Sequence, residues 1–204
     1  MTMAETADST TPADAPARRR RSTTTDIALI AAFTALIAAC ALVIGIPVGG
    51  GGVDITLQTF GVMLAGAVLG PVRGFLSVAL YLLLGAAGLP IFAGHSSGLG
   101  SFTSVSAGYL WSFPIAALLA GLLVQYVGRS RRTSALVVFL CAVPGMIVNH
   151  LAGVYGMKLF FDTDWRTAFE YDAPFWLGDV VKILVVALVA AEVHKAFPHL
   201  LRRG

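Results

Sequence analysis

Charged residues are almost absent from a long central part of this chain, and that absence limits what it can fold into. Between Ile27 and Tyr155 there are only five, namely Asp54, Arg73, Arg129, Arg131 and Arg132. Over all 204 residues, charged residues make up 12% and hydrophobic residues 57%, whereas soluble domains carry roughly 25% charged residues. So few charges cannot cover a water-soluble surface. The sequence therefore predicts an all-α integral membrane protein, because helices satisfy their own backbone hydrogen bonds in lipid.

Six apolar segments are predicted to be transmembrane helices. They comprise residues 27–46, 55–69, 75–87, 109–127, 135–160 and 175–193. The second and third are shorter than the roughly 20 residues of a full crossing, so we expect them to be tilted or to lie where the bilayer is thinned. Aromatic residues recur every four positions at Phe161, Trp165 and Phe169. That spacing predicts a separate short amphipathic helix within 158–174, lying on the outer surface.

The basic residues predict the orientation of the chain and its division into segments. With both termini in the cytoplasm, eleven of the fourteen Lys and Arg residues fall on the inner side, as the positive-inside rule requires. Residues 1–26, rich in Thr, Ala and Pro, are expected to be a disordered cytoplasmic tail. Residues 27–195 are expected to form the membrane domain and 196–204 a short cytoplasmic tail. The lipid bilayer is thus an expected partner, and the basic excess gives no reason to expect nucleic acid.

Two charges lie inside the sixth apolar segment, where each costs about 2.5–3.5 kcal/mol to insert. Asp179 and Lys182 are three residues apart, so they share one helix face in the outer half of the membrane. They could be an ion pair that only lowers the cost of insertion. Alternatively, they could anchor a ligand in an outward-facing pocket, where Asp179 would accept hydrogen bonds and Lys182 would donate them.

Neutral polar residues at a similar depth are candidates for the same pocket. They are Gln58 and Thr59 on the second segment, Tyr109 on the fourth, and Asn149 with His150 on the fifth. Asn149 and His150 could equally be packing contacts. Trp111, Trp165 and Trp176 fall at the outer boundary, either as an interfacial belt or as pocket walls.

Two further patterns have competing interpretations. Residues 94–98 fit the serine hydrolase motif G-x-S-x-G around Ser96, but no strand–turn–helix pattern surrounds them, which favours a glycine-rich outer loop. The first segment carries alanines at helical spacing, including Ala28, Ala32 and Ala35. Such a face permits close helix contact, either within the protein or against another membrane protein. No motif for nucleotide, metal or another cofactor is present, so neither catalysis nor a cofactor is expected.

Several longer stretches resemble one family. They include 56–66 (TLQTFGVMLAG), 69–74 (LGPVRG), 81–94 (YLLLGAAGLPIFAG), 108–111 (GYLW) and 174–182 (PFWLGDVVK). In this order they are similar to the BioY family, the biotin-specific substrate-binding (S) components of energy-coupling factor (ECF) transporters. The resemblance covers about residues 27–195.

The resemblance implies a fold, a ligand and partners. The fold would be the six-helix S-component fold in a bacterial plasma membrane, and the function would be biotin uptake without enzymatic activity. Asp179 and Lys182 would meet the ureido ring of biotin, and the glycines Gly49, Gly50, Gly51 and Gly52 would gate the site. A transmembrane coupling subunit and two ATPase subunits would dock partly on the alanine face of the first helix.

The chain departs from the family pattern near the expected site. Val105, Ser106 and Ala107 replace the start of a Pro-Thr-Gly-Gly-Tyr stretch, Ser112 replaces a glycine, and Asp54 stands where proline is common. For the ligand carboxylate, backbone N–H groups, Ser96, Ser97 and His95 are the donors available. The alternatives are an S component for another vitamin, an intramembrane hydrolase using Ser96, and a structural membrane subunit.

Overall fold

Six α-helices make up most of the computed structural model, which describes residues 23–43, 45–47, 52–130 and 134–198. The helices are α1 (Thr23–Val43), α2 (Gln58–Leu69), α3 (Pro71–Ala86), α4 (Ala107–Ser130), α5 (Ala135–Phe161) and α6 (Trp165–Ala196). Four of them, α1, α4, α5 and α6, are long and apolar enough to cross a membrane, whereas α2 and α3 are shorter. Six helices, two of them short, agree with the prediction from the sequence. The proposed tails lie almost wholly outside the described residues and remain predictions, although α1 already begins at Thr23.

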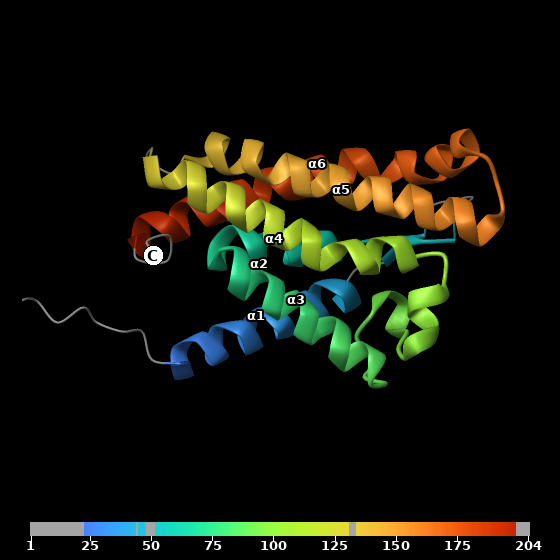
Figure 1. The fold of residues 1–204 in the computed structure, drawn as a ribbon, viewed down its shortest axis with the longest axis horizontal. Helices are drawn as coiled ribbons and strands as arrows, with labels where there is room; N and C mark the ends of the chain where they lie inside the picture. The colour runs from blue at the N-terminus through green and yellow to red at the C-terminus, as the bar shows by residue number, and fades with distance from the viewer. Residues whose placement is uncertain (1–22, 44, 48–51, 131–133, 199–204) are drawn as a thin grey trace, which may run out of the picture.

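The helix ends next to most of the basic residues lie at one end of the bundle. The starts of α1, α3 and α5 and the ends of α4 and α6 all lie at the left in Figure 1. At that end Arg73 on α3 is buried and its Nη1 lies 3.6 Å from Asp26 Oδ1 on α1. The arrangement agrees with the orientation predicted from the basic residues.

Helices α2, α3 and α4 approach closely at glycines. A Cβ added to Gly66 of α2 would lie 2.2 Å from the Ala117 carbonyl oxygen of α4, and one added to Gly74 of α3 would lie 2.7 Å from Gly66 Cα. Small residues at such crossings allow backbones to pack directly, which is a main source of helix association in lipid.

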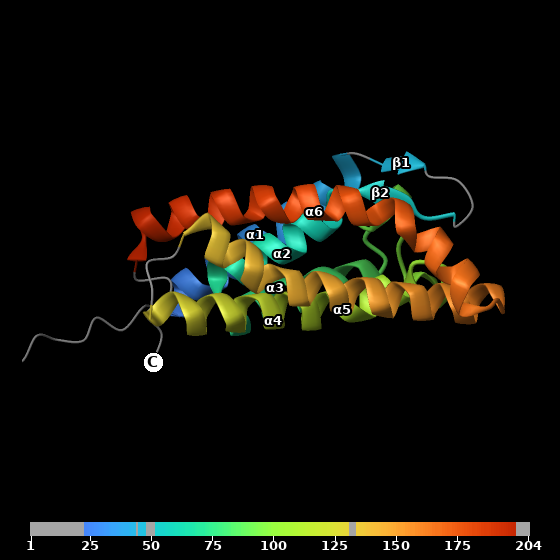
Figure 2. The same cartoon turned by 90° about the horizontal axis from the view of Figure 1, so that it is seen from above.

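A two-stranded hairpin was not anticipated in an all-helical chain. Strands β1 (Gly45–Pro47) and β2 (Asp54–Thr56) pair antiparallel, with Ile46 opposite Ile55. The predicted first helix was extended to residue 46, but α1 ends at Val43, just before Gly45 and Pro47, both of which are poor helix formers. The hairpin lies at the outer end of the bundle (Figure 2).

The predicted separate surface helix is wrong. Helix α5 ends at Phe161, and α6 begins at Trp165 and continues through Pro174 to Ala196 without interruption. The Asp164 side chain caps α6 by accepting the Thr167 N–H at 2.8 Å, which holds the pKa of this exposed carboxyl below its ordinary value. The sixth segment was expected to begin at Phe175, but Pro174 removes only one backbone hydrogen bond and the helix continues through it. The continuity of α6 places residues before and after Pro174 on one helix face.

Two short 3-10 helices, Ala93–His95 and Leu99–Thr103, lie in the segment that joins α3 to α4. Phe92, at the start of this segment, is buried against Tyr81 and Phe102 in edge-to-face contacts. The segment closes one side of the outer end of the bundle, where the candidate site lies.

Candidate substrate-binding site

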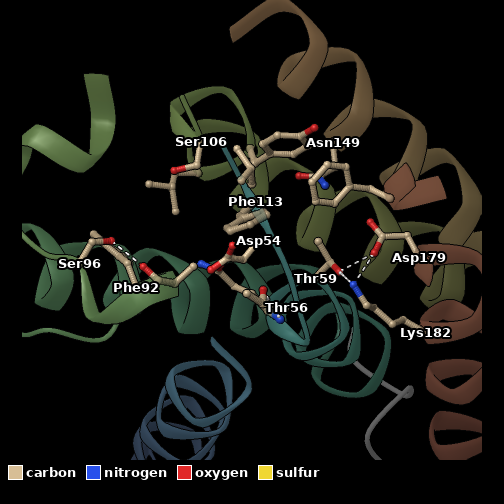
Figure 3. A pocket seen from close by; sticks show the side chains of 16 residues that line it. Asp54, Thr56, Thr59, Phe92, Ser96, Ser106, Phe113, Asn149, Asp179 and Lys182 are labelled. Carbon is tan, nitrogen blue, oxygen red and sulfur yellow. Dashed lines mark hydrogen bonds and ion pairs between the residues drawn. The ribbon is translucent and has the colours of Figure 1, made fainter. Parts of the chain in front are cut away.

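A cavity opens at the outer end of the bundle between β2, α2, α4, α5, α6 and the α3–α4 segment (Figure 3). It holds about 570 Å³ of space that protein atoms do not fill, part of which is open solvent at its mouth. All seven residues predicted to contact a substrate line it: Gln58, Thr59, Ser96, Tyr109, Asn149, Asp179 and Lys182. These residues come from five separate stretches of sequence, so the tertiary fold has brought them together.

The charged pair forms the polar end of the cavity. Lys182 Nζ donates to Asp179 Oδ1 at 2.7 Å and to Thr59 Oγ1 at 3.2 Å, and Thr59 Oγ1 donates to Asp179 Oδ1 at 3.0 Å. Both charged side chains are nearly buried, at 11% exposure for Lys182 and 6% for Asp179. An ion pair at this depth is partly desolvated, so each charge depends on its partner.

Asn149 and Gln58 are fixed by neighbouring side chains. Asn149 Oδ1 accepts from Ser112 Oγ at 2.8 Å, which leaves its two amide N–H groups to offer a ligand. Gln58 Nε2 donates to the Tyr81 hydroxyl at 2.7 Å, and that hydroxyl donates to the Ile91 carbonyl at 3.0 Å. Ser112, which departs from the family pattern, thus orients one of the predicted contact residues.

Sequence reasoning missed the apolar walls and one acidic residue of the cavity. Phe92, Phe113 and Phe175 line it, together with Val53, Leu110 and Ala93. Asp54 and Ser106, noted from the sequence only as departures from the family pattern, also line it. In a membrane protein, an apolar residue that lines a cavity cannot be told from one that faces lipid. Only the polar residues Asp54 and Ser106 could therefore be noticed in the sequence. Trp111, Trp165 and Trp176 are not among the lining residues, and Trp111 and Trp165 are exposed.

A second polar cluster lies behind the cavity and was also missed. Asp172, in the first part of α6, is fully buried. It accepts hydrogen bonds from the Tyr109 hydroxyl and from Trp176 Nε1, the latter at 2.7 Å. His150 Nδ1 lies 2.9 and 3.0 Å from its two oxygens. The only sign of this cluster in the sequence was the acidic residue Asp172 within 158–174. Because that stretch was predicted to be a separate surface helix, Asp172 was not expected to be buried beside α5.

The hydrogen bonds of Ser96 and His150 bear on the hydrolase alternative. Ser96 Oγ donates to the Ala93 carbonyl at 2.9 Å within its own loop, while His150 faces two carboxylates on α6. The Ser96 hydroxyl therefore donates to a backbone carbonyl rather than to His150. Among the described residues, no group of three His, Cys, Asp or Glu side chains is placed to hold a metal.

The glycine gate lies mostly outside the described residues. Gly49, Gly50 and Gly51 are not described. Gly52, two residues before β2, has a positive φ of 65°, and a Cβ added to it would meet nothing within 4 Å. The alanine face of α1 is described: Ala28, Ala32 and Ala35 are exposed, whereas Thr34, Ile37 and Ala41 form the packed face. Internal packing therefore does not explain the alanine face.

Known proteins are similar to this chain in sequence and in fold. The chain matches the BioY family over residues 12–199. It is 41% identical over 191 residues to the biotin transporter BioY of Rhodobacter capsulatus, covering 88% of this chain and 98% of that one. It is 38% identical over 166 residues to the probable biotin transporter BioY of Pyrococcus horikoshii, covering 81% and 93%.

A solved structure described as the S-component for biotin from an ECF-type ABC transporter superposes on this fold with a TM-score of 0.80. The two sequences are 26% identical, and the match covers 84% of this chain and 92% of that chain. The family match extends over nearly the whole chain, from before α1 to beyond α6. This chain belongs to the BioY family.

Proposed function

We propose that the protein is the substrate-specificity subunit of an ECF-type transporter and binds biotin in the outer cavity. The observation that carries the proposal is the convergence of Asp179, Lys182, Thr59 and Asn149 at one end of an apolar-walled cavity. Family membership adds the substrate class and supports a transport role rather than catalysis. The protein is accordingly a multi-pass membrane protein, and we place it in the plasma membrane of a bacterium.

The polar end of the cavity matches the ureido ring of biotin. That ring presents two N–H donors and one carbonyl acceptor. Asp179 supplies an acceptor for an N–H group, while Lys182 and the Asn149 amide supply donors for the carbonyl. Phe113 and Phe175 provide apolar surface for the fused rings. The insertion-device alternative explains the ion pair but not its position on the wall of a cavity.

The opposite end of the cavity offers neutral hydroxyl groups. Figure 3 shows Ser96 and Ser106 on the other side of the cavity from Asp179 and Lys182. An elongated ligand with a polar group at each end suits that arrangement, and biotin has its carboxylate at the end of a flexible chain. We propose that Ser96 and Ser106 lie near the carboxylate. Ser97 and His95 are not among the lining residues.

Substrate entry and the energy for transport would depend on parts of the transporter outside the cavity. We propose that the connection containing Gly49 to Gly52, which joins β1 to β2, opens and closes the outer mouth. We also propose that Ala28, Ala32 and Ala35 dock on a transmembrane coupling subunit, which would carry two ATPase subunits. An exposed stripe of small residues on a transmembrane helix allows such close contact.

The direct test is a binding titration with purified protein in detergent. We expect one biotin per protomer, bound without nucleotide, and no binding of other vitamins at the same concentration. Biotin methyl ester would test the contribution of the carboxylate separately. Tight binding of a different vitamin in place of biotin would support the alternative S component, and absence of any vitamin binding would reject the proposal.

A further inference from the structure

A polar path runs from the cavity into the contact between α5 and α6. Asp172, Trp176 and Asp179 occupy positions i, i+4 and i+7 of α6 and so share one face. Opposite them on α5 lies His150, which is fully buried. Its ring stacks on Trp176 with centroids 4.4 Å apart and an interplanar angle of 17°. One end of this path is the cavity residue Asp179, and the other is Asp172, which does not reach the cavity.

The groups around Asp172 are hydrogen-bond donors. Trp176 Nε1 can only donate, and Tyr109 directs its hydroxyl to Asp172 Oδ1. His150 Nδ1 lies within 3.0 Å of both carboxylate oxygens. An ionised carboxylate, which only accepts, satisfies all three partners at once. It follows that His150 Nδ1 carries a proton.

The other ring nitrogen of His150 faces the cavity acid. Nε2 is buried and lies 3.4 Å from Asp179 Oδ2. In a neutral imidazole with its proton on Nδ1, Nε2 would be an acceptor. It would then face another acceptor, the Asp179 carboxylate, and the two would repel. A second proton, on Nε2, makes the contact a charge-assisted hydrogen bond.

The charges of the whole cluster then balance. On α6 the groups facing His150 are Asp172 and Asp179, with Lys182 paired to Asp179. On α4 the titratable neighbour is Tyr109, through Asp172, and α2 contributes no charged residue. Two carboxylates, one ammonium and one imidazolium sum to zero, whereas a neutral His150 would leave one negative charge uncompensated in a low-dielectric interior.

We infer that His150 and Asp172 are positioning residues of the substrate site. A doubly protonated His150, anchored by Asp172, holds the Asp179 carboxylate from behind while its other oxygen binds Lys182 and Thr59. Asp179 is thereby fixed in the orientation that accepts a substrate N–H. The inference rests on the proposed function, because it assigns the substrate contact of Asp179 to the biotin ureido group.

The first experiment reads the protonation of His150 without any ligand. Protein labelled with ¹⁵N-histidine gives separate ring-nitrogen signals for His95, His150, His194 and His199, and the spectrum of the His150→Gln variant assigns the one that disappears. At pH 7 we expect both ring nitrogens of His150 in wild-type protein to show the shifts of an imidazolium. A neutral ring at this pH overturns the inference. If wild-type protein binds no biotin, the proposed function fails while this measurement still reports on His150.

The second experiment connects the cluster to substrate. Asp172→Asn keeps the side-chain shape but removes the charge, so His150 should lose one proton and biotin affinity should fall by roughly tenfold, the scale of one hydrogen bond. The matched control is His194→Gln, a second buried histidine at the other end of α6 whose Nε2 lies 3.5 Å from the Val68 carbonyl. Its affinity should stay within about twofold of wild type, as expected for distant sites. Unchanged affinity in Asp172→Asn overturns the positioning role, and the protonation experiment remains decisive if that variant does not fold.

Discussion

At the scale of single residues, the cavity depends on charges that are costly to place in a membrane. Asp179 and Lys182 reduce each other's cost as an ion pair, and Thr59 and His150 add contacts on the remaining sides of the carboxylate. Removing one charge leaves the other buried and unpaired, which is more damaging than removing both. Single and double substitutions therefore distinguish a ligand contact from an insertion device.

The charge pair gives the first prediction. Asp179→Asn should weaken biotin binding by about 10–150-fold, corresponding to roughly 1.5–3 kcal/mol for one charge-assisted hydrogen bond. Lys182→Met should also weaken binding. If the pair contacts biotin, the double variant should be produced well yet bind no better than either single variant in the same titration. Near wild-type affinity in the double variant would show that the pair serves insertion only.

Ser96 gives the second prediction. Its hydroxyl makes one neutral hydrogen bond, to the Ala93 carbonyl, in an exposed part of the loop. Ser96→Ala should therefore cost about 1 kcal/mol or less in binding, which is at most roughly fivefold to tenfold. Biotin uptake by cells that produce the variant measures the effect. A loss of several orders of magnitude would instead indicate a nucleophile and revive the hydrolase alternative.

At the scale of elements, helix contacts in this bundle depend on glycine where two backbones meet. Gly66 of α2 lies directly against the Ala117 carbonyl of α4, and no side-chain movement can relieve a clash with backbone. The same approach recurs between Gly108 of α4 and the Ala152 carbonyl of α5, which a Cβ would meet at 2.1 Å. These contacts fix the separation of the helices that carry the cavity residues.

Gly66→Ala gives the third prediction. The added methyl group must push α2 and α4 apart, and overpacking of this kind costs about 1–3 kcal/mol. We expect a lower apparent melting temperature in detergent, with biotin affinity reduced because Thr59 and Tyr109 move with these helices. Gly100→Ala is the matched control, since a Cβ there meets nothing within 4 Å. Equal melting temperatures for the two variants would show that the α2–α4 crossing is not tightly packed.

At the scale of the whole molecule, the two functional surfaces lie far apart. The cavity is at the outer end of the bundle, whereas α1 begins at the other end (Figure 1). Ala28 and Ala32 are exposed residues in the first half of α1. Binding and docking should therefore be separable by mutation.

Ala32→Trp gives the fourth prediction. A large side chain on the small-residue face prevents close helix contact, so the variant should fail to co-purify with the coupling subunit and its ATPases. Its own biotin affinity should stay within about twofold of wild type, because the two sites are distant. Leu151→Trp, at an exposed position on α5, should leave co-purification intact. Normal assembly of the Ala32→Trp variant would place the docking surface elsewhere.

Much of the fold could be predicted because membrane insertion is governed by properties of the chain in sequence order. The scarcity of charge between Ile27 and Tyr155, the lengths of the apolar segments and the distribution of basic residues determined a six-helix membrane protein and its orientation. Asp179 and Lys182 were identifiable for the same reason, since charges inside an apolar segment are costly wherever they lie. The resemblance to one family supplied the substrate.

Only the tertiary structure decided which face each residue presents and to which partner. Asp172 and His150 are 22 residues apart on different helices. Their contact depends on α6 continuing through Pro174, whereas the sequence predicted two separate helices there. The exposure of the alanine stripe depends on how α1 is rotated against α2 and α3, and hydropathy does not encode that rotation when every face is apolar. The hairpin and the aromatic cavity walls likewise depend on long-range packing, because the same apolar residues would suit either lipid or a protein interior.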